Sequence, residues 1–202
     1  MTKNAVSVYM AATCSMVIVA PGRLVCGIIF AVEIFLLMLF GILFKALIKK
    51  LKLHKLMQFC MLLFVVYFTL LFKNLLILLM PEMALQMGFL LFLPTISTFT
   101  TVFLLDKTDS TLKETFIKDF PLTFLFSGYI LIFSLVRDIF GYGTISLPGA
   151  GRHIEIVIFN PSGISVMSFI ATIPGALILT SLLLSLYLHL EKKYHILIKA
   201  GE

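Results

Sequence analysis

The chain has 202 residues, of which 60% are apolar and only 13% are charged, and its mean hydropathy is +1.11. A soluble domain of this size could not bury that much apolar surface, so the composition excludes a soluble protein and indicates an integral membrane protein. The net charge of +6 does not indicate nucleic-acid binding, because the basic residues concentrate in a few loops. The length predicts one domain over residues 1–202.

Six apolar segments are candidates for membrane-spanning helices, each of which needs about 20 residues to cross roughly 30 Å of hydrocarbon. In chain order the predicted segments are Ala5–Ala20, Leu24–Ile48, Leu56–Met80, Met83–Leu105, Pro121–Phe140 and Val166–Leu190. The apolar runs show no alternation with turns every ten residues or so, which argues against a transmembrane barrel. We therefore predict an all-α polytopic membrane protein with six transmembrane segments.

The distribution of basic residues predicts the orientation of these segments. Twelve of the sixteen basic residues lie near the two termini and in the loops after the second and fourth segments. They are Lys3, Lys45, Lys49, Lys50, Lys52, Lys55, Lys107, Lys113, Lys118, Lys192, Lys193 and Lys199. The opposite face would hold only Arg23, Arg137 and Arg152. By the positive-inside rule, both termini are predicted to be cytoplasmic in the inner (cytoplasmic) membrane of a cell.

Two of the six segments are irregular. Ala5–Ala20 has only 16 residues and carries Thr13-Cys14-Ser15 at its middle, and the fourth segment contains Pro94 followed by the cluster "TISTFTT". If the chain consists of two halves of three segments, these are the first segments of each half. A short or interrupted helix at matching positions predicts a 3+3 inverted repeat with a site near the midplane. The alternative is a proline kink whose hydroxyl groups bond to their own helix.

Glu33 and Lys73 lie within apolar segments. A charge in the middle of a membrane helix costs at least about 2.5–3.5 kcal/mol, so such residues usually face a bundle interior or a polar cavity. Glu33 is near the middle of its segment, which makes an ion path through Glu33 a hypothesis. The alternative is a neutral buried carboxyl that is hydrogen-bonded to a neighbouring helix. Lys73 is close enough to the outer end of its segment to reach the interface.

Residues 134–149 read "SLVRDIFGYGTISLPG" and form a charged, glycine-rich corner at the end of the fifth segment. Arg137 and Asp138 are adjacent, so on a helix they point about 100° apart and cannot face each other. Near the end of a segment, both charges are expected to reach the interface. Gly141 and Gly143 are expected to let the chain leave the helix through positive φ angles. A charged helix end with a glycine cap would explain the same residues.

The motifs of this corner resemble a known family. "SLVRDIFGYGTI" is similar to a signature of the Rnf/Nqr membrane subunits, of the Rnf E / Nqr D type, and "RHIEIVIFN" and "ATIPGALILTSLLLSL" resemble the segments that follow it. "MAATCSMVIVA" and "FLPTISTFTTVFLLDKTDS" resemble the first and fourth segments of that family. The resemblance covers nearly the whole chain and is most specific from Ser134 to Gly175.

The resemblance implies an integral membrane subunit of an ion-translocating electron-transport complex. In this family two homologous six-helix subunits pack in inverted orientation around the transmembrane electron path. Each supplies one cysteine from each half-helix, so that four thiolates hold a shared [2Fe-2S] cluster. The resemblance also implies that the corner formed by Arg137, Asp138, Gly141 and Gly143 docks onto the partner subunit or onto the neighbouring segment "RHIEIVIF".

The cluster ligands match this chain only in part. Cys14 matches the first ligand position, whereas the second falls at Thr100, or at Thr101 if the alignment shifts by one. A threonine hydroxyl is a hard donor that stays protonated and replaces a thiolate poorly. Cys26 and Cys60 lie elsewhere along the chain and are not expected to replace it. We therefore expect no normal four-cysteine cluster, and the alternative function is a cluster-less paralogue that acts as a small transporter or structural membrane subunit.

Overall fold

The structure is a computed structural model that describes residues 18–53, 56–98, 112–149, 153–158 and 168–183, together with residues 185 and 189. Within these ranges the chain is mainly helical, and three helices are long and apolar enough to cross a membrane. They are α2 (Leu24–Lys50), α3 (Met57–Leu79) and the Thr123–Tyr142 part of α6 (Leu112–Tyr142). They correspond to the predicted second, third and fifth segments.

The first and last predicted segments are described only in part. Only the last residues of Ala5–Ala20 lie within the described ranges. The described part of the last segment contains α7 (Ser168–Ala171) and helical residues at Ile173–Leu183. Six spans and a 3+3 inverted repeat therefore remain predictions.

The fourth segment is interrupted, as predicted, but Pro94 is not where it breaks. As far as Thr98, where the described range ends, it consists of α4 (Pro81–Met87), the 3-10 helix η2 (Gly88–Leu91) and α5 (Phe92–Thr98). Gly88 has a φ of +38°, which a glycine adopts readily and other residues rarely do. Pro94 lies in the first turn of α5, where a helix has no intrahelical partner for its amides and tolerates proline. The attribution of the break to Pro94 was wrong.

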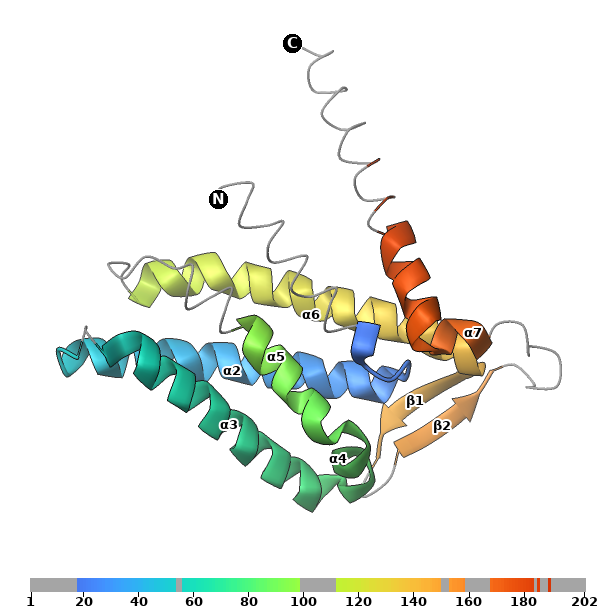
Figure 1. The fold of residues 1–202 in the computed structure, drawn as a ribbon, viewed down its shortest axis with the longest axis horizontal. Helices are drawn as coiled ribbons and strands as arrows, with labels where there is room; N and C mark the ends of the chain where they lie inside the picture. The colour runs from blue at the N-terminus through green and yellow to red at the C-terminus, as the bar shows by residue number, and fades with distance from the viewer. Residues whose placement is uncertain are drawn as a thin grey trace, which may run out of the picture.

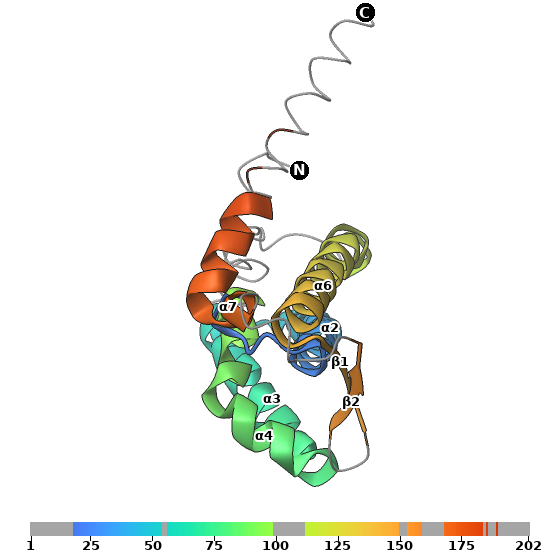
Figure 2. The same cartoon turned by 90° about the vertical axis from the view of Figure 1, so that its right-hand side faces the viewer.

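A β-hairpin follows α6 and was not predicted. Strand β1 (Thr144–Pro148) pairs antiparallel with β2 (His153–Val157), with Thr144 opposite Val157 and Pro148 opposite His153. The hairpin lies at the end of the bundle where α2 begins and α6 ends, next to α4 (Figure 1). Figure 2 views the molecule from that end, with β1 on the side of α2. The all-helical description therefore fails at this corner.

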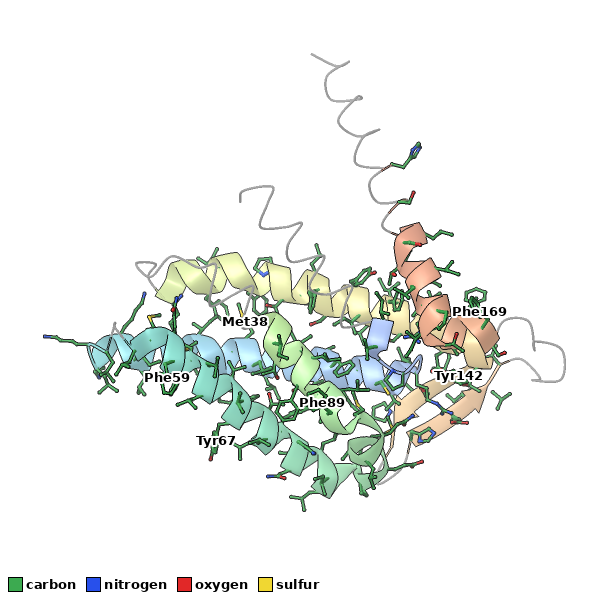
Figure 3. The ribbon with its side chains drawn as sticks, viewed as in Figure 1. Met38, Phe59, Tyr67, Phe89, Tyr142 and Phe169 are labelled. Atoms are coloured by element: carbon green, nitrogen blue, oxygen red, sulfur yellow. The ribbon has the colours of Figure 1, made fainter. Side chains whose placement is uncertain are left out.

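Helix α2 is the central helix of the described bundle. In the most apolar 18-residue stretch of α2, 67% is buried, whereas the corresponding stretch of α3 is only 22% buried. Helix α3 therefore presents most of its surface outward. Phe44 of α2 stacks on Phe64 of α3 with ring centroids 4.3 Å apart, and Phe40 of α2 packs at a tilt against Phe68 of α3. Side chains such as Tyr67 project from α3 away from the bundle (Figure 3). An outer face of this kind suits contact with lipid.

Candidate functional site

Arg137 of α6 is almost completely buried, at 1% exposure, and donates hydrogen bonds to backbone carbonyls of two distant segments. Its Nη1 lies 2.7 Å from the Ala20 carbonyl oxygen, its Nη2 2.7 Å from that of Ala171, and its Nε 3.4 Å from that of Ile170. Ala20 lies just before α2, and Ile170 and Ala171 end α7. The last carbonyls of a helix have no intrahelical partner, and a guanidinium offers five donors in a planar fork. Arg137 thus connects α6 to the backbone just before α2 and to the C-terminal end of α7.

Asp138 accepts hydrogen bonds from backbone amides, whereas Arg137 donates them to backbone carbonyls. Its Oδ2 accepts hydrogen bonds from the backbone nitrogen of Leu24 at 3.1 Å and from the nitrogen and hydroxyl of Ser146 at 2.7 and 2.6 Å. Its Oδ1 accepts one from the Thr144 hydroxyl. The Ser146 hydroxyl oxygen in turn accepts from the amide of Val25. Since the N-cap residue of α2, Arg23, makes no side-chain cap bond, side chains of α6 and β1 cap α2 instead.

The two glycines of the corner have different roles. Gly143 has a φ of +69°, and its amide donates to the Ile139 carbonyl at 3.0 Å, so it ends α6 as expected. Gly141 remains within α6 and has no positive φ, contrary to expectation. A Cβ atom at Gly141 would lie only 2.7 Å from the Cβ and 2.9 Å from the nitrogen of Ala171. Gly141 therefore permits the close contact between α6 and the end of α7.

We call Arg137, Asp138, Gly141 and Gly143, with the backbone that they contact, the joint. Both charges were expected to reach the interface, and this was wrong, because neither side chain exceeds 1% exposure. Among the described residues, the two side chains bind backbone or hydroxyl groups of Ala20, Leu24, Thr144, Ser146, Ile170 and Ala171. A role of the joint in docking a partner subunit stays a prediction.

Arg23 forms a second polar cluster, at the N-terminal end of α2. Its Nη1 donates to Glu155 Oε1 and lies 3.0 Å from His153 Nε2, and His153 Nε2 lies 2.8 Å from Glu155 Oε1. Glu82 of α4 approaches His153 Nδ1 at 3.4 Å, and the Arg23 guanidinium lies 5.0 Å from the centre of the Tyr142 ring. The hydrogen bond from Arg23, followed by that from His153, lowers the pKa of Glu155. This cluster attaches β2 to the starts of α2 and α4.

Sequence reasoning missed the cluster around Arg23. The signal was the alternation in "HIEIV", where His153 and Glu155 are two residues apart and so share one face of a strand. It was overlooked because the segment lies between two predicted membrane helices.

Glu33 is fully buried, at 0% exposure. Neither of its carboxyl oxygens has a hydrogen-bond partner among the residues that the structure describes. The alternative of a carboxyl bonded to a neighbouring helix therefore finds no support in those ranges. Lys73, by contrast, is only partly buried on α3.

The predicted cluster ligands Cys14, Thr100 and Thr101 lie outside the described residues. Cys26 is buried in the first turn of α2, and Cys60 is partly buried on α3. In the described ranges no group of three or more His, Cys, Asp or Glu side chains could hold a metal ion.

Comparison with known proteins identifies no relative. No family model, no curated protein and no solved structure matches this chain. The resemblance to the Rnf/Nqr subunits thus depends on the sequence motifs alone.

Proposed function

We propose that the chain is an integral membrane subunit of an Rnf/Nqr-type ion-translocating electron-transport complex, in which it pairs with a homologous inverted subunit around the transmembrane electron path. It would lie in the inner membrane with both termini cytoplasmic. The observation that supports the proposal best is the joint. The signature residues Arg137, Asp138, Gly141 and Gly143 gather in one buried unit that binds the backbone just before and at the start of α2 and at the end of α7.

A membrane subunit of this type needs such a unit. Lipid offers no hydrogen bonds to backbone groups, so short or interrupted helices in a membrane need protein partners at their ends. Arg137 supplies donors at Ala20 and Ala171, and Asp138 supplies an acceptor at Leu24. The interrupted segment α4–η2–α5 adds a second broken helix, in keeping with folds built from discontinuous helices.

The second candidate is a cluster-less paralogue that acts as a small transporter or structural membrane subunit. One observation favours it: threonine occupies both candidate positions of the second cluster ligand, Thr100 and Thr101.

Purification from native membranes with all bound partners tests the proposal. We expect a homologous membrane subunit and flavin- or iron–sulfur-bearing subunits to co-purify, identified by mass spectrometry and by iron and sulfide analysis. A stable, monodisperse chain without partners in mild detergent would contradict the proposed complex and favour the second candidate.

Substitution of Cys14 tests the cluster within that complex. Because an oxygen ligand replaces a thiolate poorly, we expect Cys14→Ser to leave the activity and the electron paramagnetic resonance spectrum nearly unchanged. Cys60→Ser is the matched control, since Cys60 lies on the outward-facing helix α3. If Cys14→Ser abolishes a [2Fe-2S] signal, the cluster is present. Either the alignment of the fourth segment is then wrong, or Cys26 or Cys60 supplies the missing thiolate.

A further inference from the structure

Glu33 lies near the middle of α2 and faces the interior of the bundle. It is nine residues after Leu24, or about 14 Å along the helix axis. Phe40 follows seven residues later and so lies on nearly the same face, where it packs against Phe68 of α3. Val32, its neighbour in the chain, points outward at 46% exposure. The carboxyl is therefore directed toward the side of α2 that packs against α3.

No donor among the described residues reaches this carboxyl. Cys26 and Leu37, which share its helical stripe, are buried members of the α2 core face. The buried hydroxyls of Thr69 of α3 and Thr95 of α5 bond to each other. They also bond to the carbonyls of Val65 in α3 and Leu91 in η2, respectively. Within the described residues both Glu33 oxygens are left without a hydrogen bond. The side chain is thus buried without the contacts that normally accompany a buried polar group.

No opposite charge compensates for this burial. Among the described residues, no charged group on the packed elements α3, α5, α6 or β1 acts on the carboxyl. Arg137 and Asp138 lie at the start of α2, Lys45 lies about 18 Å toward its other end, and Lys73 of α3 is turned partly to the surface. Elements α5 and β1 carry no titratable side chain. An ionised carboxylate could not persist there without a bound cation, because burial of an unpaired charge is strongly unfavourable.

A proton fits this site better than a metal ion does. A hard metal cation needs several oxygen ligands, whereas a proton needs one. Besides the two Glu33 oxygens, the only buried side-chain oxygen without a partner in the described residues is the Ser127 hydroxyl of α6. The unpartnered side-chain oxygens of the described residues are therefore too few for a metal coordination shell, and a metal ion would need backbone carbonyls as further ligands.

We infer that Glu33 is a proton-binding site inside the helical bundle, whose carboxyl is neutral when the bundle is closed and exchanges its proton with water when the site opens. The step is an acid–base exchange in which the proton passes between a carboxyl oxygen and water, with no redox change. This inference goes beyond the proposed function and does not depend on which partner subunit the chain binds.

Dicyclohexylcarbodiimide labelling in membranes that contain the full chain tests the inference. The reagent is apolar and reacts with protonated carboxyls: the acid oxygen bonds to the central carbon, its proton moves to nitrogen, and acyl migration leaves a stable N-acylurea. We expect mass spectrometry to find this adduct on Glu33 at about pH 7 to 8, where exposed carboxyls are ionised. The adduct should be lost at more alkaline pH and absent from Glu33→Gln, and Glu82→Gln, which alters an exposed carboxyl, should label like the wild type.

Two results would overturn the inference. Protection of Glu33 from the reagent by sodium at constant pH would assign the site to a metal cation. The second readout is the infrared carbonyl band of a protonated carboxyl, identified by its loss in Glu33→Gln. We expect this band to shift in heavy water within minutes, and a band that never exchanges would make Glu33 a sealed structural carboxyl. Neither readout depends on partner subunits or electron transport, so failure of the proposed complex would be seen separately.

Discussion

The Asp138 carboxylate of α6 caps a helix that begins 114 residues earlier in the chain, with its Oδ2 at 3.1 Å from the amide nitrogen of Leu24. Helix caps are usually supplied by the residue just before the helix, but that position in α2 is Arg23, which makes no cap bond. The start of α2 therefore depends on a side chain that reaches it only when α6 is packed in place.

Removal of this carboxylate should destabilise the chain. Asp138→Ala leaves the buried amides of Leu24 and Ser146 without acceptors, and each such group costs about 1–3 kcal/mol. We expect a loss of at least about 2 kcal/mol in the free energy of unfolding, measured by denaturant titration in detergent. Asp138→Asn keeps one acceptor oxygen and should lose less. Equal losses in the two variants would contradict capping through hydrogen bonds.

Lysine should not replace Arg137. A single ammonium on a flexible stem cannot hold the carbonyls of Ala20 and Ala171 in the way that two guanidinium nitrogens do. We expect Arg137→Lys to lose about 2 kcal/mol or more, since at least one buried carbonyl is left unpaired. Arg23→Lys is the control: this side chain is partly exposed, and its effect should stay within about 1 kcal/mol. Thermal unfolding of the two variants makes the comparison, and a larger effect at Arg23 would contradict it.

Two glycines of α6 provide a matched pair for testing the close contact with α7. A Cβ atom at Gly141 would meet backbone and side-chain atoms of Ala171, whereas one at Gly128 would meet nothing within 4 Å. We expect Gly141→Ala to destabilise the chain by about 1–3 kcal/mol through overpacking. Gly128→Ala should be neutral, or stabilising by up to about 1 kcal/mol, because alanine favours the helix. The melting temperature should therefore fall in Gly141→Ala and should stay unchanged or rise in Gly128→Ala.

Acid should weaken the attachment of the hairpin. Hydrogen bonds from Arg23 and His153 lower the pKa of Glu155, so the folded state binds this proton less readily than the unfolded state does. The resulting stabilisation is complete above the unfolded pKa of about 4.3 and is lost as the pH falls through the lower folded value. We expect the stabilities of the wild type and Glu155→Gln to differ at neutral pH and to converge in acid. A difference that is independent of pH would rule out an ionic contribution.

The orientation of α2 can be tested by labelling. The helix has 27 residues, or about 40 Å, with Lys50 at one end and the hairpin at the other. In a cysteine-free background, an impermeant maleimide added to intact cells should label Ile154→Cys and should label Lys50→Cys only after lysis. Ile154 suits this test because it is an exposed residue of β2. Labelling of both positions from the same side would contradict a membrane-spanning α2.

Local composition predicted the long helices well. Segments α2 and α3 are apolar runs of more than 20 residues without an internal proline, and their bounds agree with the predicted ones within two residues. Helix α6 begins at Leu112, nine residues before the predicted start at Pro121. Hydropathy did not predict these first turns because they contain charged and polar residues. Proline is accommodated there although it removes one backbone donor.

The contacts of the corner could not be predicted in the same way. The sequence singled out Arg137 and Asp138, but their partners at Ala20 and Leu24 are more than 110 residues away in the chain. Backbone carbonyls and amides carry no sequence signal, so a side chain that binds them leaves no complementary residue to find. Burial of Glu33 was foreseeable from its place in an apolar run, whereas its lack of hydrogen bonds required the positions of its neighbours.

The bond between Arg137 and Ala20 has a consequence for biosynthesis. During translation Ala20 emerges 117 residues before Arg137, so its carbonyl and the amide of Leu24 must wait for α6 to be made. The N-terminal end of α2 can therefore be completed only after the fifth predicted segment has left the ribosome. A nascent chain stopped before that point would present an unfinished helix end to chaperones and membrane proteases.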